Sequence, residues 1–496
     1  MKLLNRTKML IKASVVLAIA LAFLMPVTAL TSQTQFVANL NEPKNILGRG
    51  EWIAQASGFA TASRGIRSLD AVDNMTAWAI AYDGSGGNAA TTDFTMTTDG
   101  GNIWTANYIL ASAGYGLGNI WGLSGTVAYA ALFNQDGAQD TVCGPYKTTN
   151  GGSTWTQLGH YPISFCNNVI FWNENEGVVL GDTLDGYFED YYTSDGGTTW
   201  TRVPLANYSG LAAQSGEGGW TGVVDAVGDT VIFGTNLGNV YISHDRGHTW
   251  FASYSGASNG GLNGGVNDLA FKDGTHGLVA HDNGVTFDLF ETMDGGVSWA
   301  PVTYSGTCFS SGLAYLPGTA NKYVSVGAAT GSSGASYSLD GGHSWINYDE
   351  MANIQMLATD FVDGEIGWAG GFNTDDVSGG MFKHMPSENP EPAFSINIVG
   401  GKGFIVTIKN VGDGAATNVT CDVTIEGGLF IKPKAFSGTQ ATLGSGGNFT
   451  VIGAPKGIGL GILKPKPTIK INVNCTEGIG ATYTVTAKIF FSKITI

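Results

Sequence analysis

The sequence has few charged residues. Asp, Glu, Lys and Arg make up 13% of its 496 residues, about half of the usual share of about 25%. A charge-poor, aromatic-containing chain is not typical of disordered proteins, and it is also unlike coiled coils, which use Ala, Glu, Lys and Leu. The 24 basic and 40 acidic residues give a net charge of -16. Because a basic surface is what binds phosphates, we expect no nucleic-acid partner.

Proline, cysteine and long apolar runs are also scarce. The 14 prolines follow no Gly-X-Y period, which excludes collagen. Beyond the N-terminal segment no run approaches the roughly 18 apolar residues of a membrane-spanning helix. The five cysteines match no zinc motif. Cys421 and Cys475 lie in strand-like runs and are predicted to form a disulfide, with two free thiols as the alternative; Cys143 and Cys166 could pair across neighbouring repeats, which leaves Cys308 unpaired.

The first 29 residues have the pattern of a signal peptide. Four basic residues precede an apolar run over residues 13–24, and the small residues Val27 and Ala29 follow at the spacing of a cleavage site. We therefore expect cleavage near Ala29, an N-terminal extension over residues 30–50, and a protein that is secreted or held at the cell surface, with no transmembrane segment after cleavage. An uncleaved anchor helix is the alternative.

Glycine and aromatic residues are abundant. Glycine accounts for 74 residues, roughly twice its usual share, and there are 12 Trp, 18 Tyr and 24 Phe. Many glycines with many aromatics and few charges are typical of short strands joined by tight turns.

Six segments share the pattern Ser/Thr-x-Asp-x-Gly-x-x-Trp. Successive tryptophans of these segments are 45 to 51 residues apart, and a period of 40–50 residues with four strand-like runs per unit indicates propeller blades. The aspartate or asparagine and the tryptophan of each segment are Asp99 and Trp104, Asn150 and Trp155, Asp195 and Trp200, Asp245 and Trp250, Asp294 and Trp299, and Asp340 and Trp345.

The chemistry of this pattern is that of a turn. The aspartate side chain accepts hydrogen bonds from nearby backbone N–H groups, glycine adopts the positive φ that the turn needs, and the tryptophan buries its ring between repeats. We therefore predict a structural role for these residues.

The pattern resembles the Asp-box, or BNR repeat, of sialidases, sortilin-type receptors, xyloglucanases and photosystem II assembly factors. The resemblance covers roughly residues 51–384. It implies a β-propeller but not a function, because these families do unrelated things on one scaffold.

We predict an all-β chain with a seven-bladed propeller over residues 51–385. A seventh unit has strand-like runs but no box, and residues 51–54 are expected to complete it, which removes an open sheet edge. A proline-rich linker over residues 386–393 precedes alternating runs over residues 394–496. These runs predict an Ig-like β-sandwich, and residues 409–419 resemble modules of prokaryotic surface proteins, through which surface association could occur.

In the resembling propellers the boxes lie on the face opposite the functional one, so we look for a site in the loops between second and third strands. These loops are acidic. Asp83, Asp93, Asp182 and Asp185 are the candidate catalytic carboxylates of a glycosidase, which needs a pair of them. The further candidates for ligand binding are Asp136, Asp140, Tyr187, Glu189, Tyr191, Asp282, Asp288, Asp375 and Asp376. The alternative is a solvated acidic rim.

One acidic run could bind calcium, which takes carboxylate oxygens. It contains Asp182, Asp185, Glu189 and Asp190, but it does not fit the EF-hand loop. We therefore expect no cofactor, with calcium as the alternative.

Arginine is too rare for a sialidase site, which holds a carboxylate with three converging arginines. Beyond the signal peptide there are five: Arg49, Arg64, Arg67, Arg202 and Arg246. Arg246 lies inside a box and Arg202 just after one, so both are predicted to be on the box face. We therefore predict an exported, non-catalytic propeller that binds a glycan or a protein on its acidic loops. The alternatives are a glycoside hydrolase with paired carboxylates and an extracytoplasmic assembly factor.

Overall fold

A computed structural model describes residues 50–495 except 88, 138–139, 160–162, 258–263, 283–286, 330, 387–391, 393, 411, 413, 428, 445, 460–466 and 492. Over these residues the protein is all-β: it has strands, two 3-10 turns, η1 (Leu205–Asn207) and η2 (Asp349–Met351), and no α-helix. The chain divides into two compact units, Trp52–Met385 and Pro386–Ile496. The predicted signal peptide lies outside the described residues.

The first unit repeats a set of four antiparallel strands joined in chain order. The first three sets are β2 (Arg64–Ala71), β3 (Ala77–Asp83), β4 (Asp93–Thr97) and β5 (Thr105–Tyr108); β6 (Tyr115–Gly122), β7 (Ala128–Asn134), β8 (Gly144–Thr148) and β9 (Thr156–Gln157); and β10 (Asn168–Phe171), β11 (Gly177–Leu180), β14 (Tyr191–Thr193) and β15 (Thr201–Arg202). A small hairpin, β12 (Thr183–Leu184) with β13 (Tyr187–Phe188), is inserted in the third set.

Three further sets follow the same order. They are β17 (Gly219–Val227), β18 (Thr230–Thr235), β19 (Asn239–Ser243) and β20 (Trp250–Tyr254); β21 (Asp268–Phe271), β22 (Gly277–Asp282), β23 (Phe287–Thr292) and β24 (Ala300–Val302); and β25 (Gly312–Tyr315), β26 (Tyr323–Ala329), β27 (Ser332–Ser338) and β28 (Ile346–Asn347). The short strand β16 (Tyr208–Gly210) adds to β20 in parallel.

The last set combines both ends of the unit. It contains β29 (Met356–Phe361), β30 (Gly367–Asp375) and β31 (Ser378–Met385), and β31 takes β1 (Glu51–Ala56) as its neighbour. A single pairing between Gly65 and Phe372 joins this set to β2. We interpret the four-strand sets as the predicted blades, with β1 as the strand that completes the last one.

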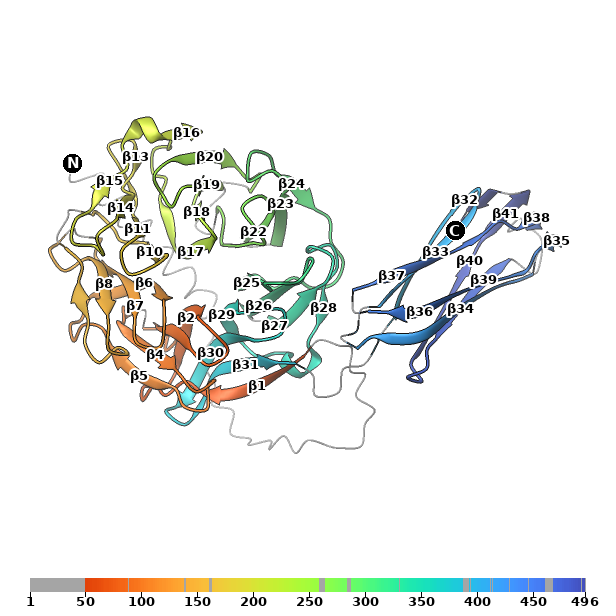
Figure 1. Ribbon diagram of the computed structural model, residues 1–496, viewed down its shortest axis with the longest axis horizontal. Helices are drawn as coiled ribbons and strands as arrows, with labels where there is room; N and C mark the ends of the chain where they lie inside the picture. The colour runs from red at the N-terminus through yellow and green to blue at the C-terminus, as the bar shows by residue number, and fades with distance from the viewer. Residues whose placement is uncertain are drawn as a thin grey trace. The chain divides into compact units, whose positions relative to one another are not determined.

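The sets form a ring, as Figure 1 shows. The first strand of each set contacts the first strand of the next in the circuit β2, β6, β10, β17, β21, β25, β29 and again β2. We call these seven the inner strands. Most inner strands form the inner edge of their own sheet, and the closed circuit of contacts between them surrounds a central axis.

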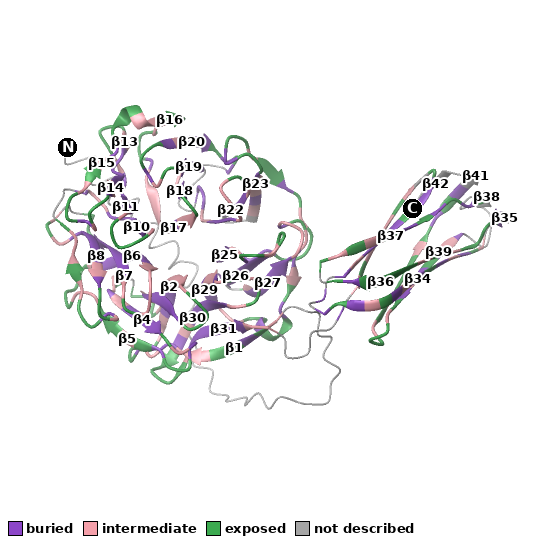
Figure 2. Cartoon of the chain, in the orientation of Figure 1, coloured by how far each residue is buried: buried purple, intermediate pink, exposed green. Residues whose placement is uncertain are grey.

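Apolar side chains pack between successive sets, and Figure 2 shows buried residues on strands around the ring. The largest are fully buried aromatic residues such as Trp78, Trp250, Trp368, Tyr129 and Phe233. Fully burying one large apolar side chain contributes about 1.5–3 kcal/mol. The hydrophobic core of the propeller is therefore distributed around the ring, between sheets, rather than gathered at its centre.

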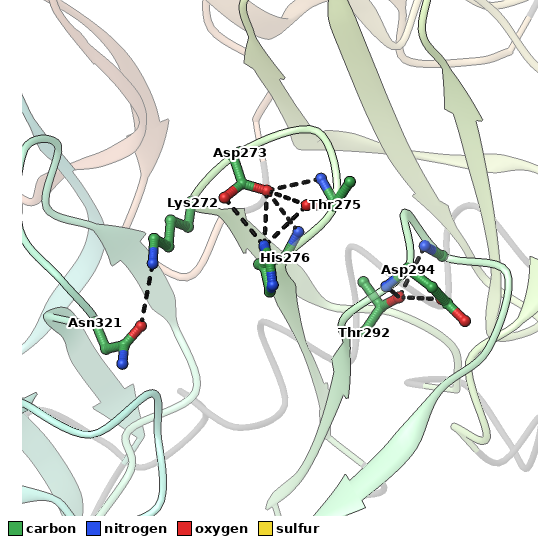
Figure 3. Close-up of polar contacts among 8 residues, drawn as sticks. Lys272, Asp273, Thr275, His276, Thr292, Asp294 and Asn321 are labelled. Carbon is green, nitrogen blue, oxygen red and sulfur yellow. Dashed lines mark hydrogen bonds and ion pairs between the residues drawn. The ribbon is translucent and has the colours of Figure 1, made fainter.

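Each box closes the turn between the third and fourth strands of a set, as Figure 3 shows for Thr292 and Asp294. The Thr292 hydroxyl donates to Asp294 Oδ1 at 2.9 Å, and the backbone N–H of Gly296 donates back to Thr292 Oγ1 at 2.8 Å. The N–H of Ser298 also donates to Asp294 Oδ1, at 2.9 Å. Gly295 and Gly296 have φ of 72° and 79°, the region that favours glycine.

The box tryptophans connect neighbouring sets. Trp155 packs edge-on against Phe94 of the preceding set, with ring centroids 5.3 Å apart. Trp200 donates from Nε1 to the carbonyl of Leu158, also in the preceding set, at 3.0 Å. Each box therefore holds one turn and contributes to one junction.

The second unit has eleven described strands in three sheets. They are β32 (Phe394–Gly401), β33 (Gly403–Asn410) and β37 (Asn448–Gly453); β36 (Ala435–Leu443), β34 (Ala416–Glu426), β39 (Thr468–Asn474) and β40 (Gly480–Thr486); and β35 (Leu429–Lys432), β38 (Lys456–Gly459), β41 (Lys488–Phe491) and β42 (Lys493–Thr495). One buried apolar cluster draws on all three sheets. The Ig-like assignment stays a prediction.

The predicted disulfide is not formed. Cys421 is buried and free, and Cys475 is half-buried and free. In the antiparallel register Cys421 lies opposite Val473, so Cys475 is displaced diagonally by two residues. Diagonal neighbours are about 7–8 Å apart, beyond the usual reach of a disulfide. Cys143, Cys166 and Cys308 are buried free thiols as well.

Candidate functional site

A cavity of about 1200 Å³ lies between the inner strands of the propeller. Its walls come from β2, β6, β17, β21, β25 and β29, together with Asn167 just before β10. The pairing of Ala71 with Ala77, and of Ala77 with Thr97, places the carboxyl ends of the inner strands on the side of the boxes. We call this side the box end and the opposite side the loop end, where Arg64 pairs with Asp83.

Irregular backbone shapes the wall of this cavity. The ladder between β2 and β3 shifts register between Ile66 and Ser68, so that Arg67 is the extra residue of a bulge. Similar shifts occur in β6 between Leu117 and Ile120, and in β17 between Gly219 and Val224. Bulges turn side chains out of the ladder and are common beside functional sites.

Arg67 reaches across the cavity from its bulge. Its guanidinium donates from Nη2 to the hydroxyl of Thr221, on β17, and its Cζ lies 6.0 Å from the ring centroid of Phe133. Burial lowers the pKa of Arg67 below its usual value. Among the described residues that line the cavity it is the one arginine, so three converging arginines are not found there.

Aromatic rings line part of the same wall. Phe133 and Phe165 stack with centroids 4.7 Å apart and an angle of 26° between their planes. Trp121 and Trp220 also line the cavity.

Four aspartates line the cavity in positions that the sequence did not single out: Asp70, Asp225, Asp268 and Asp360. Each lies on a different inner strand and accepts a backbone N–H from the inner strand of the next set. Asp225 accepts from Phe271 at 2.7 Å and Asp360 from Ala71 at 2.8 Å. Asp268 accepts from Leu313 at 2.6 Å, and Asp70 accepts from Gly122.

Asparagines make the same connection at two other junctions. Asn119 accepts from the N–H of Val169 at 2.8 Å, and Asn168 accepts from the N–H of Gly222 at 2.8 Å. Gly312 is the first residue of β25, as Asp268 is the first residue of β21. At the junction of β25 with β29 a glycine therefore stands at the position that carries the acceptor side chain in β21. We call these six acceptor side chains the junction acceptors.

The four junction aspartates are half-buried at the cavity wall. Burial raises the pKa of Asp70 and of Asp268 to about 7, and that of Asp225 to about 6, although hydrogen bonds from the backbone act in the opposite direction. The pKa of Asp360 is raised by burial and by the charge of Asp70. The repeated pattern at successive junctions indicates that these carboxylates connect blades.

The first two candidate catalytic carboxylates are held by an arginine. Arg64 Nε lies 3.0 Å from Asp93 Oδ2, and Arg64 Nη1 lies 3.5 Å from Asp83 Oδ1. Asp83 also accepts from the backbone N–H groups of Ser85 and Ala89, each at 3.1 Å. Burial tends to raise the pKa of Asp83, but these hydrogen bonds and Arg64 lower it overall. Asp83 therefore fixes its own loop as an anion.

The other two candidate catalytic carboxylates, Asp182 and Asp185, have different surroundings. Asp182 is buried at the cavity wall and accepts from Asn167 Nδ2 at 2.9 Å. Asp185 lies in the exposed turn of the β12–β13 hairpin, with φ of 57°. The two residues do not form a carboxylate pair.

The suggested calcium run does not converge on one point. Glu189 accepts from the N–H of Ser164 at 2.8 Å, whereas Asp190 accepts from the Tyr208 hydroxyl at 2.9 Å. Over the described ranges no group of three or more His, Cys, Asp or Glu side chains is arranged to hold a metal ion. Burial raises the pKa of Asp190 to about 7 and also raises that of Glu189.

Arg202 is found on the other side from the one predicted. Its Cζ lies 3.9 Å from the ring centroid of Tyr187, and Nη2 donates to the carbonyl of Leu184 at 2.9 Å. Both partners belong to the β12–β13 hairpin, between second and third strands, so Arg202 reaches the loop end. The reason is the length of its side chain and its pairing with Tyr191, near the start of β14. Tyr191 itself is buried in the core.

The remaining loop acids have separate surroundings. Asp140 accepts from Tyr115, Asn134, Val142 and Cys143, and these bonds lower its pKa to about 2 although burial acts in the opposite direction. Asp136 is exposed and contributes to the cavity lining, and Asp375 and Asp376 are exposed in the β30–β31 turn. Asp282 pairs with Phe287 through the backbone, and Asp288 is half-buried on β23 opposite His281.

The comparisons with known proteins concern the fold. No family model matches the chain, and no curated protein matches it. Among solved structures, "YCF48 bound to D1 peptide" is 14% identical, covers 69% of this chain and 99% of that chain, and has a TM-score of 0.47. A GH74 xyloglucanase from Xanthomonas campestris is 12% identical, covers 87% and 70%, and has a TM-score of 0.29.

A mutant of Trypanosoma rangeli sialidase displaying trans-sialidase activity is 10% identical, covers 90% and 92%, and has a TM-score of 0.38. These similar structures include hydrolases as well as YCF48. The sheets and boxes described above give this chain the fold of a BNR-type, sialidase-like β-propeller. In the described part of the chain no helix is long and apolar enough to cross a membrane.

Proposed function

We propose that the protein is an exported binding protein whose propeller takes a glycan or a protein segment into the loop end of its axial cavity without chemical turnover. The observation that carries this proposal is the cavity of about 1200 Å³, walled by bulged inner strands. Ligand pockets typically have volumes of about 300–1,000 Å³, apolar walls and a few placed polar groups. Stacked Phe133 and Phe165 beside Arg67 provide such a wall.

The loop carboxylates support binding rather than catalysis. A glycosidase keeps one carboxylate as an acid and the other free to attack or to activate water. Asp83 and Asp93 are paired with Arg64, and Asp140 is saturated with hydrogen bonds. Asp83 and Asp140 hold their own loops in this way.

The cavity proposal is tested by blocking the loop end. Ser310 lines the cavity and is half-buried, so a Ser310→Trp variant places an indole in the entrance. Thr105→Trp is the matched control, because Thr105 is exposed on β5 and lies outside the cavity lining. A glycan array and a peptide array, each probed with residues 30–496, supply the ligand.

We expect Ser310→Trp to weaken binding of the selected ligand at least tenfold, and Thr105→Trp to leave it within about twofold of wild type. Equal binding by both variants, with both folded by circular dichroism, would place the ligand elsewhere and refute the proposal. The same arrays distinguish glycan from protein ligands.

A second candidate function, glycoside hydrolysis, has one observation in its favour. Asp70 and Asp360 both line the cavity, and the charge of Asp70 raises the pKa of Asp360, as in paired catalytic carboxylates. Against this, each carboxylate accepts a backbone N–H across a blade junction. Release of reducing sugar that is lost in both Asp70→Asn and Asp360→Asn would establish the hydrolase and overturn the binding proposal.

Export and assembly are proposals of their own. Export predicts that the secreted protein begins near Leu30, which N-terminal sequencing measures directly. An assembly factor would co-purify with a partner complex, and that hypothesis stays a prediction.

A further inference from the structure

Arg67 differs from the other described arginines in lacking a carboxylate or carbonyl partner. Arg64 is paired with Asp83 and Asp93, and Arg246 with Glu176 and Asp229. Arg202 donates to a backbone carbonyl and stacks on Tyr187. The single hydrogen bond of Arg67 goes to a neutral hydroxyl, that of Thr221.

This guanidinium is desolvated as well as unpaired. Burial lowers its pKa, and the titratable group that acts on its charge is Tyr82. A charge that is partly removed from water is normally paired, so the cavity contains a half-buried cation whose counter-anion the described residues do not supply.

Arg67 lines the cavity and has N–H donors without a described acceptor. Arginine carries five N–H donors in a planar fork, and the one acceptor that Arg67 has among the described residues, Thr221 Oγ1, is bonded to Nη2. Arg67 is part of the cavity lining and is the bulge residue of β2. The remaining N–H groups are therefore available to an oxyanion, which a guanidinium binds in a bidentate manner.

The surroundings of Arg67 narrow the chemistry of the anion. The acidic side chains Asp136 and Asp182 line the same cavity, as do the junction aspartates, and they repel a dianion more strongly than a monoanion. The stacked rings of Phe133 and Phe165 lie beside Arg67, whose Cζ is 6.0 Å from the ring centroid of Phe133. They favour an apolar group next to the anion over a hydroxylated one.

We propose that Arg67 binds the carboxylate of a ligand whose adjoining group is aromatic or aliphatic and packs against Phe133 and Phe165. The inference rests on the proposed function, because it assigns the part of the ligand that enters the cavity. Thr221 holds the guanidinium across the cavity, and the fork presents its free edge to the carboxylate. Arg67 is thus a residue that determines ligand specificity.

The experiment titrates purified residues 30–496 by isothermal calorimetry with N-acetyl-L-phenylalanine as the probe. N-acetyl-L-phenylalaninamide is the neutral counterpart, and D-glucuronate is a carboxylate on a hydroxylated ring. The variants are Arg67→Gln, which removes the charge, and Arg67→Lys, which keeps the charge but loses the fork. Arg246→Gln is the matched control, since Arg246 lies in a box and outside the cavity lining.

We expect wild type and Arg246→Gln to bind the acid at least tenfold more tightly than the amide or the glucuronate. Arg67→Gln is expected to lose this preference, and Arg67→Lys to keep part of it. Equal affinity for acid and amide, an unchanged preference in Arg67→Gln, or tighter binding of glucuronate would each overturn the assignment. If Arg67→Gln does not fold, Arg67→Lys decides: an affinity for the acid equal to that of wild type overturns the assignment.

Failure here is distinguishable from failure of the proposed function. A ligand from the arrays whose binding is lost in Ser310→Trp but unchanged in Arg67→Lys leaves the cavity proposal in place and removes the carboxylate assignment. Array ligands insensitive to Ser310→Trp remove the cavity proposal itself.

Discussion

At the scale of single residues, the same turn is built with two different side chains. In the fourth box the Ser243 hydroxyl donates to Asp245 Oδ1 at 2.7 Å, and the Thr249 N–H donates to the same oxygen at 2.8 Å. In the second box Asn150 accepts the corresponding bonds from Thr148 and Thr154, both at 3.0 Å. An amide oxygen therefore suffices, and the carboxylate charge is not essential to the turn.

This comparison predicts the effect of two substitutions. Asp245→Ala removes the acceptor of the turn. A hydrogen bond of this kind contributes about 0.5–1.5 kcal/mol, and Asp245 is exposed to solvent, which weakens its bonds. We therefore expect the substitution to lower the free energy of unfolding by about 1–2 kcal/mol. Asp245→Asn is expected to cost less than half as much, because it reproduces Asn150. Urea unfolding of the three proteins measures both values. Equal losses in the two variants would show that charge, not geometry, holds the turn.

At the scale of elements, the junction acceptors connect inner strands by one side chain each. Two of them are asparagines and four are aspartates whose pKa values are raised. A raised pKa means that the folded state favours the protonated carboxyl group, so ionisation at neutral pH opposes folding. The aspartates are therefore a cost to stability that the asparagines avoid.

Asp225→Asn is expected to change stability in a pH-dependent way. The folded pKa of Asp225 is about 6, whereas an unfolded aspartate has a pKa of about 3.9. At pH values between these two pKa values, the folded protein binds more protons than the unfolded protein does. The stability of the wild type therefore falls as the pH rises through this range. The melting temperature of the variant relative to wild type is therefore expected to increase from pH 5 to pH 8.

Asp245→Asn serves as the control for this series. Hydrogen bonds from Thr249 and Ser243 lower the pKa of Asp245 overall, against the effect of burial, so its charge does not change between pH 5 and pH 8. Its melting temperature relative to wild type is expected to stay constant. A flat difference for Asp225→Asn as well would contradict the raised pKa of the junction aspartate.

The sequence specified elements better than it specified the site. Box spacing predicted a repeat of four strands, and residues 268–271 form the first strand of one set, β21. The role of Asp268 in that run was missed, because alternation of apolar residues does not reveal an acceptor buried at a cavity wall. The one available signal was the recurrence of Asp or Asn in the first strand of successive repeats, as in Asn168 and Asp268.

Two acids of the predicted loop site hold their own loops. Asp83 and Asp140 each accept backbone N–H groups two to six residues away. Acidic residues near turns commonly act in this way, and a sequence does not distinguish them from ligand-binding acids.

At the scale of the whole molecule, charge and core are divided between the two units. Residues 51–385 carry 8 basic and 33 acidic residues, whereas residues 386–496 carry 10 and 6. Over the described residues each unit also has its own buried clusters. We therefore expect the units to unfold as separate cooperative transitions.

Calorimetry of two core variants tests this independence. Ile471→Ala is expected to destabilise the second unit alone, and Val324→Ala the propeller alone, because each side chain is fully buried in its own cluster. The cost of an Ile→Ala change in a core is about 2–5 kcal/mol. A shift of both transitions in either variant would indicate one cooperative unit.

The central claim is that the ligand occupies the axial cavity. A crystal structure of residues 30–496 with the ligand selected by the arrays tests it most directly. We predict ligand density at the loop end, in contact with Phe133 and Phe165 and with its carboxylate on Arg67. Ligand density on the box face, or on the unit beyond residue 385, would contradict the account.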